Sequence, residues 1–217
     1  ITEEDRSMIK GEALFLRGYQ YFLLVNNYKE VPLRLIPSNE DETNKGPASE
    51  AALWTQVEED LGNAIKCNLP VERTTAKERV TKGAAIAMLG KVYATQHKYP
   101  EAKQLLVSLL SAPYSYELVD DFAKNFTNEE EFNKESVYEI AYSPDGEYSW
   151  SNESGICLGC YIPQFIGPVK SGGWAKLMPN SFIVGEFTKE TRPNGADTNF
   201  DKRIYASLST LPTMETK

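Results

Sequence analysis

Residues 80–110 read VTKGAAIAMLGKVYATQHKYPEAKQLLVSLL, and this stretch decides the fold of the chain. Apolar residues recur in it at steps of three and four, which predicts two helices joined by a turn near 96–98. Gly90 and Ala102 are small enough to let two antiparallel helices approach closely. The larger residues predicted to fill the space beside them are Leu89, Tyr93 and Tyr99. Pro100 suits the first turn of the second helix, where its missing N–H is not needed.

This order of a leucine–glycine pair, a tyrosine, an aromatic residue and an alanine is typical of a tetratricopeptide helical hairpin. One such hairpin cannot bury its own apolar face, so it needs neighbouring helices. The sequence predicts two of them upstream, over 2–28 with Thr2 as N-cap and over 49–68 with Ser49 as N-cap. Together these segments predict a mainly α fold with about two helix pairs.

The upstream helices carry recognisable apolar stripes. In the first, the expected core stripe consists of Ile9, Ala13, Leu16, Tyr19 or Gln20, and Leu23. In the second it consists of Ala52, Leu53, Trp54, Val57, Leu61, Ala64 and Ile65. Three consecutive acids of the second helix, Glu58, Glu59 and Asp60, are expected on its solvated face.

The pattern changes after Pro113. Residues 136–142 alternate in character, which predicts a short strand, and 203–208 predict another. A helix is predicted over 179–187, with Asn180 or Ser181 as its cap. Between these elements the sequence shows no sustained period and is rich in glycine, proline, serine and aromatic residues. We therefore divide the chain into a helical scaffold, 1–112, and a loop-rich ligand-binding portion, 113–217.

Composition excludes several classes of function. The 217 residues include 41% hydrophobic and 25% charged residues and carry a net charge of -8. An acidic chain of this kind does not suit nucleic acid as a partner. No segment approaches the roughly eighteen apolar residues of a membrane-spanning helix.

Motifs for metal binding and catalysis are weak. Cys157 and Cys160 form a CxxC pair, but a zinc site needs two further ligands, so a structural thiol pair or a local disulfide is the favoured interpretation. Residues 197–201 resemble the start of a calcium loop but lack its glycine and its closing glutamate. Asp201 and Arg203 are therefore expected to form a structural pair. We predict no metal site, no cofactor and no catalytic residue.

The order of segments is similar to the SusD/RagB family. Residues 11–35, GEALFLRGYQYFLLVNNYKEVPLRL, resemble that family's E-A-x-F-L-R opening helix and its G-D-V-P-L exit, and 79–106 resemble its R-x-T-K-G-A-A segment. Residues 116–140 follow the family's YELV and ESIFEI succession, and Gly173-Trp174 matches its G-W landmark. The chain departs from the family where Asn26 to Glu30 replace the glycine–aspartate pair. The resemblance also suggests a fragment without the signal, the lipid-attachment cysteine and the C-terminal part.

The resemblance implies a lipoprotein on the outside of the outer membrane that binds glycans and is not an enzyme. It implies a SusC-like TonB-dependent transporter as protein partner, which receives the glycan. Membrane contact would be made only through a lipid anchor. Two alternatives stay open: a tetratricopeptide-type module that binds a protein or peptide, and, with less support, an enzyme acting on glycosides.

Glycan binding requires aromatic rings that lie against sugar C–H faces and polar groups that meet the hydroxyls. The irregular segment offers such residues: Tyr148, Trp150, Asn152, Tyr161, Gln164 and Trp174. Trp174 lies on the G-W landmark, which also suits a packing role. A second wall is predicted at the end of the first helix, formed by Asn27, Tyr28 and Arg34.

Overall fold

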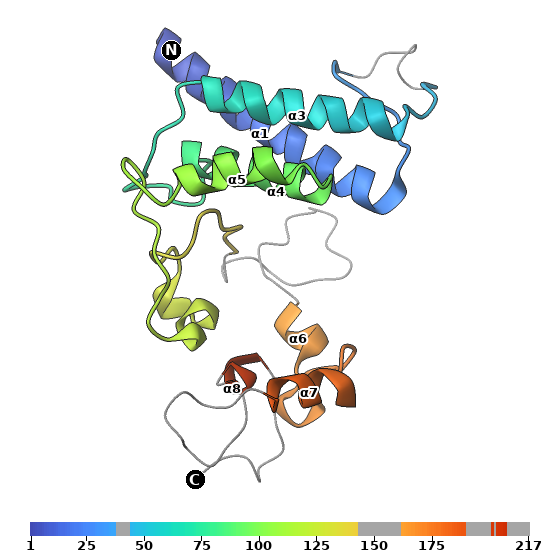
Figure 1. Ribbon diagram of the computed structural model, residues 1–217, viewed down its shortest axis with the longest axis vertical. Coiled ribbons are helices and arrows are strands. Elements are labelled where there is room, and N and C mark those ends of the chain that lie inside the picture. Colours follow the sequence, from blue (N-terminus) through green and yellow to red (C-terminus); the bar gives the residue numbers. More distant parts are fainter. Residues whose placement is uncertain (38–43, 143–161, 190–200, 202, 208–217) are drawn as a thin grey trace. The chain divides into compact units, whose positions relative to one another are not determined.

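The structure is a computed structural model that describes residues 1–37, 44–142, 162–189, 201 and 203–207 (Figure 1). It forms two compact units, of which the first is Ile1–Leu118 with Lys134–Glu139. The second comprises the described residues of Val119–Asn133 and Ile140–Lys217. The described residues are mainly helical, which confirms the predicted fold class. The proposed roles of 1–112 as scaffold and 113–217 as ligand-binding portion stay a prediction.

Helix α1, Glu3–Tyr28, begins at the predicted N-cap, Thr2. The Thr2 hydroxyl accepts a hydrogen bond from the Asp5 N–H (3.0 Å), and the Asp5 carboxylate accepts one from the Thr2 N–H (3.1 Å). This reciprocal arrangement satisfies two N–H groups that otherwise lack partners at a helix start. The hydrogen bonds from Thr2 lower the pKa of Asp5.

The buried face of α1 is not the one that the sequence predicted. Ile9, Leu16 and Leu23 are 49%, 46% and 37% exposed, so the predicted core stripe is wrong. The residues that α1 buries are Gly11, Phe15, Gly18, Tyr21, Phe22 and Val25. The buried and the predicted rows both repeat at helical spacing, so periodicity alone could not separate them.

Two glycines explain which face of α1 is buried. A Cβ added to Gly11 would lie 2.8 Å from the Cβ of Cys67, and one added to Gly18 would lie 3.0 Å from the Cγ of Leu61. Leu61 belongs to α3 and Cys67 is the C-cap of that helix. Helices α1 and α3 therefore approach each other along the row of Gly11 and Gly18. Apolar residue counts miss such a row because glycine contributes no side-chain area.

Helix α3, Glu50–Lys66, is capped by Ser49, whose hydroxyl accepts from the Ala52 N–H (3.3 Å). Four residues of the predicted stripe, Leu53, Val57, Leu61 and Ala64, are fully buried, whereas Ala52 is exposed and was wrongly placed in the stripe. Trp54 lies at the edge of this core, where its ring meets Phe22 edge to face.

The prediction that Asp60 lies on the solvated face of α3 is wrong, because this residue is only 1% exposed. Its carboxylate accepts two hydrogen bonds from Arg17 of α1, from Nε (2.7 Å) and Nη2 (2.6 Å). Gln56 donates a third (2.9 Å). The hydrogen bond to Asp60 raises the pKa of Arg17. Burying a charged side chain is costly unless the side chain is paired and hydrogen-bonded. Arg17 supplies that pairing from another helix.

The predicted hairpin is confirmed as α4, Lys82–Thr95, and α5, Tyr99–Ser108, with Pro100 in the first turn of α5. A Cβ added to Gly90 would lie 2.7 Å from Leu106 Cδ2, and Ala102 is buried, so both small residues mark the close approach. Tyr99 departs from the prediction: it is 61% exposed, and its hydroxyl lies 2.7 Å from His97 Nδ1.

The helices of the first unit pack in the order α1, α3, α4, α5, because α3 contacts α1 and α4, and α4 contacts α5. Most residues of α4 are buried, including Ala84, Ala85 and Val92. Helix α4 is therefore the centre of the helical core. Its partners on either side are α3 and α5.

The predicted strands are wrong within the described residues, where the only β pairing is an isolated bridge between Val31 and Ala48. Residues 136–142 form no strand, and Tyr138 packs edge to face on Phe15 (ring centroids 5.1 Å apart) instead of joining a ladder. The second predicted strand is helix α8, Ile204–Ser207. Alternating residue character shows which side chains would share a face of a strand, but a strand also needs hydrogen-bond partners from a neighbouring strand.

The second unit consists of short elements. They are η1, Phe122–Phe126; η2, Asn128–Glu130; α6, Ile162–Ile166; η3, Val169–Ser171; α7, Ser181–Phe187; and α8. The predicted helix over 179–187 is confirmed as α7, with Asn180 as cap: its side chain accepts from the Ile183 N–H (2.9 Å).

Candidate functional site

A tight turn after α6 is the best-defined candidate site in the second unit. The Trp174 N–H donates to the Gln164 carbonyl (2.7 Å), and the Lys176 N–H donates to the Phe165 carbonyl (3.0 Å). The Ala175 N–H donates to the Gly167 carbonyl (2.9 Å). These three backbone hydrogen bonds fix the segment that follows η3 against α6. We call residues 164–176 the aromatic turn.

Glycine is required at two positions of the aromatic turn. Gly172 has φ 82°, a conformation that side chains disfavour. A Cβ on Gly173 would lie 2.1 Å from the Gly167 carbonyl oxygen, a backbone atom that cannot move aside. The sequence Gly172-Gly173-Trp174 therefore produces a chain reversal that places the indole beside α6.

Two aromatic rings form the surface of this turn. Trp174 is 38% exposed and Phe165 is 42% exposed. Their ring centroids are 6.3 Å apart and the planes meet at 63°, an edge-to-face arrangement. Each ring thus supports the other while both keep area at the surface, which is the arrangement expected of an apolar binding platform.

The structure brings together two of the predicted site residues, Gln164 and Trp174, through the hydrogen bond that joins their backbones. Gln164 is exposed, so its side-chain amide can meet a ligand beside the indole. Phe165 was not among the residues predicted for the site. Its aromatic character was the available signal, but only the Gly173 reversal shows that it adjoins Trp174.

Four predicted site residues lie outside the described residues: Tyr148, Trp150, Asn152 and Tyr161. The same holds for the CxxC pair, Cys157 and Cys160, and for Asp197 and Asn199 of the calcium-like segment. Their predicted roles stay predictions.

The remaining three predicted residues belong to the first unit. The Asn27 side chain donates to the Leu23 carbonyl of its own helix (2.8 Å), and Tyr28 is exposed at the end of α1. The Arg34 N–H donates to the Tyr21 hydroxyl (2.7 Å), which holds Arg34 about two helical turns before Tyr28. Asn27 and Tyr28 therefore lie near one another, whereas Arg34 is held beside an earlier turn of α1, at Tyr21.

In the described part of the chain, no group of three or more His, Cys, Asp or Glu residues has the arrangement of a metal site. The expected pair of Asp201 and Arg203 is present: Arg203 Nε donates to Asp201 Oδ2 (2.6 Å), and the Arg203 N–H donates to Oδ1 (2.9 Å). The hydrogen bond from the guanidinium lowers the pKa of Asp201.

None of the described helices combines the length and the apolar character that a membrane span requires.

Two family models match the chain. The first, SusD-like and described as "Starch-binding associating with outer membrane", matches residues 1–94. The second, described as "SusD family", matches residues 134–211. Among curated protein sequences, none matches the chain.

Solved structures give a consistent result. A SusD superfamily protein from Bacteroides vulgatus is 32% identical, with a TM-score of 0.76 over 94% of this chain and 40% of its own. A laminarin-binding SusD-like protein is 34% identical, with a TM-score of 0.66 over 70% of this chain and 34% of its own. A SusD-like carbohydrate-binding protein from Bacteroides fragilis, 22% identical with a TM-score of 0.72 over 94% of this chain and 38% of its own, shows the shared fold.

The stacked helix pairs of the first unit define a protein of the helical-repeat class. The chain belongs to the SusD/RagB family, as both family models and the 32% identical structure show. It spans 40% or less of the length of the three solved relatives described above.

Proposed function

We propose that the protein to which this chain belongs binds glycans at the cell surface and does not cleave them. The observation that carries the proposal is the half-exposed pair of Trp174 and Phe165 on a turn with a fixed backbone. Flat rings bury apolar area against sugar C–H groups at small entropic cost, and the Gln164 amide can orient a hydroxyl. A relative that is 34% identical over the aligned part of the two chains is a laminarin-binding protein, which supports a saccharide ligand.

The proposal extends to location and partner. The family model that matches residues 1–94 is described as associating with the outer membrane. We therefore place the protein on the outer face of that membrane, held by a lipid anchor, where it delivers saccharides to a SusC-like TonB-dependent transporter. Co-purification of the tagged protein with such a transporter from outer membranes tests this partner. Recovery of the protein alone from gently solubilised membranes would contradict it.

A protein-docking function is the second candidate, and one observation favours it. Ile9, Leu16 and Leu23 repeat every seven residues along α1 and remain exposed, so they form an apolar row on one helix face. A row of this kind is typical of a surface that meets another protein. If the row contacts the transporter, Leu16→Glu weakens co-purification, whereas Gln104→Glu, the same gain of charge at an exposed position of α5, serves as the control.

Calorimetry with the purified chain tests glycan binding at the aromatic turn. Laminarin and starch oligosaccharides serve as probes, and the variants are Trp174→Ala and the control Phe182→Ala, which removes an exposed ring from α7. Loss of one stacking ring is expected to cost about 1.5 kcal/mol, roughly tenfold in affinity. The control is expected to bind like the wild type.

Three outcomes would overturn parts of this proposal. If no saccharide of a broad panel binds, the glycan function is wrong. If a saccharide binds equally well to Trp174→Ala with an unchanged circular dichroism spectrum, the site lies elsewhere. If reducing ends accumulate during incubation, the protein is an enzyme.

A further inference from the structure

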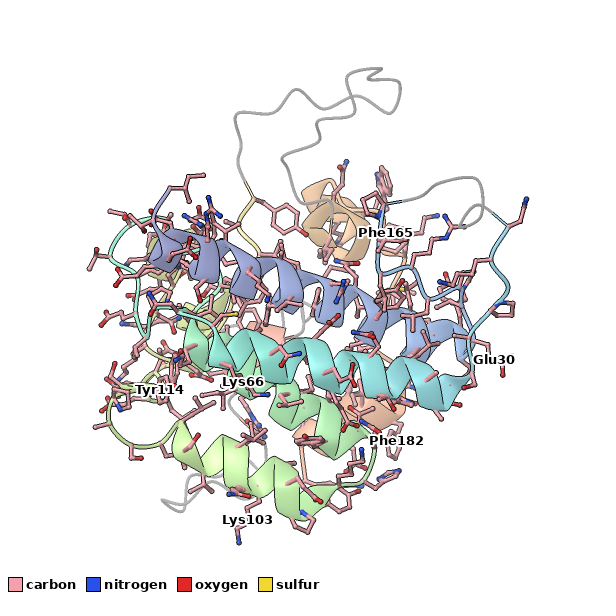
Figure 2. The ribbon with its side chains drawn as sticks, turned by 90° about the horizontal axis from the view of Figure 1, so that it is seen from above. Glu30, Lys66, Lys103, Tyr114, Phe165 and Phe182 are labelled. Carbon is pink, nitrogen blue, oxygen red and sulfur yellow. The ribbon has the colours of Figure 1, made fainter. Side chains whose placement is uncertain are left out.

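The first unit contains a hollow between the N-terminal half of α1 and the C-terminal end of α3, with a volume of about 540 Å³. Pockets of this size hold small ligands. The residues that line it are Glu3, Arg6, Ser7, Lys10, Leu14, Asn63, Lys66 and Cys67. Figure 2 shows Lys66 at the end of α3 beside α1. Neither the predicted sites nor the proposed function uses this hollow.

The charge of the hollow is opposite to that of the chain. Arg6, Lys10 and Lys66 are cations and Glu3 is the one anion among the lining residues, which gives a net charge of +2 there. The whole chain has a net charge of -8. Glu3 compensates Arg6 only weakly, because their charged atoms are 3.7 Å apart and both side chains are mostly exposed.

The hollow also presents hydrogen-bond donors that protein acceptors leave available. Among the described residues, Lys10 makes no ion pair, and Lys66 makes one long hydrogen bond, to Asn63 (3.3 Å). The Ser7 hydroxyl accepts from the Asn68 N–H (3.0 Å), so its own proton is free to donate into the hollow. Ser7 and Lys10 lie three residues apart on α1 and so share a face.

An apolar floor accompanies these donors. Leu14 and Cys67 are partly buried and line the hollow on the side where α1 meets α3. Cationic donors around an apolar floor suit a sugar ring that bears a carboxylate or sulfate, since the ring needs apolar contact and the anion needs charge-assisted hydrogen bonds. A neutral saccharide would leave the ammonium groups without their best partner.

We propose that this hollow binds the anionic group of an acidic saccharide, a uronate or a sulfated sugar. The saccharide part of the inference rests on the proposed glycan function, but anion binding by the hollow does not. The ammonium groups of Lys10 and Lys66 hold the anion, and the Ser7 hydroxyl donates to it. This would make the helical unit a second point of contact for glycans, selective for charge.

Calorimetry with a charged and an uncharged probe tests the proposal: an oligogalacturonate and the same oligomer with its carboxylates methyl-esterified. The acidic oligomer is expected to bind more tightly, and more weakly as salt rises. Each cation removed is expected to weaken binding about fivefold, the effect of one unit charge at 4 Å in water. The variants are Lys10→Gln and Lys66→Gln, and the control is Lys103→Gln, an exposed lysine on α5 that is far from Lys66 in Figure 2.

Cys67 provides a second readout that places the ligand. Its thiol lines the hollow, so a bound saccharide is expected to slow its alkylation, measured by peptide mass spectrometry. Galacturonate and inorganic sulfate are compared as ligands that protect Cys67 from alkylation. If sulfate protects Cys67 and galacturonate does not, the hollow binds anions without recognising a sugar, and the saccharide part of the inference is overturned. Equal binding of the charged and esterified oligomers, or unchanged affinity in both lysine variants, overturns the whole inference. Binding of neutral glycans at Trp174 would be unaffected by that failure.

Discussion

The ion pair between Arg17 of α1 and Asp60 of α3 offers the most direct test of how the helical unit is held together. Its two ends differ in burial: 2% of the Asp60 side chain is exposed, compared with 33% of the Arg17 side chain. Removing one partner of a buried pair costs about 3–5 kcal/mol because the other charge remains desolvated. The cost should therefore depend on which partner is removed.

Arg17→Met leaves a carboxylate in the core whose remaining hydrogen-bond donor is the Gln56 amide (2.9 Å). We expect this variant to lose about 4 kcal/mol of unfolding free energy. Asp60→Leu leaves a guanidinium that reaches water and the Leu35 carbonyl (3.4 Å), so about 2 kcal/mol is expected. The double variant should recover most of the loss, since an apolar replacement of a buried pair is often close to neutral.

Urea unfolding followed by far-ultraviolet circular dichroism measures these differences, because the first unit supplies most of the described helix. Wild type, both single variants and the double variant form one thermodynamic cycle. Equal losses in the two single variants would show that burial does not set the cost. A double variant that is less stable than either single variant would refute the argument that the pair is replaceable.

Three further predictions concern local structure. Gly62→Ala should stabilise α3 by about 1 kcal/mol, because no atom lies within 4 Å of the new Cβ and alanine favours the helix. Gly173→Ala should disrupt the aromatic turn, since its Cβ would meet the Gly167 carbonyl oxygen, and tryptophan fluorescence reports the change. Arg203→Gln should raise the pKa of Asp201, which nuclear magnetic resonance titration measures. Because folding lowers that pKa, the pair stabilises α8 above about pH 4 and loses its effect as pH falls through the lowered value.

Each of these predictions has a matched control or an outcome that contradicts it. Gly185→Ala, in α7 and without a neighbour within 4 Å, is the control for Gly173→Ala. A melting temperature that falls on Gly62→Ala would show a contact at that helix face. An Asp201 pKa that stays the same in Arg203→Gln would mean that the guanidinium is not its stabilising partner.

The hairpin was predictable because its determinants are local. The small residues Gly90 and Ala102 and the turn before Pro100 lie within one stretch of chain, and the structure places them as expected. N-caps such as Thr2 and Ser49 were equally visible, since a cap depends on residues only three positions apart.

The candidate site was predictable only in its residue types. Gln164 and Trp174 could be singled out because an aromatic ring and an amide in an irregular segment suit a saccharide. The adjacency of Gln164 and Trp174 could not be predicted, because it depends on the close approach of Gly173 to the Gly167 backbone. Phe165 was missed for the same reason.

The sequence by itself determined the helical class, the hairpin, the helix caps and, through the order of its segments, the family. Only the tertiary structure decided which face of α1 is buried, that Asp60 is in the core, and that residues 204–207 form a helix and not a strand. The physical reason is the same in each case. Helical periodicity and capping act over a few residues, whereas burial of Asp60 requires Arg17 from another helix, and a strand requires a partner strand that local sequence does not contain.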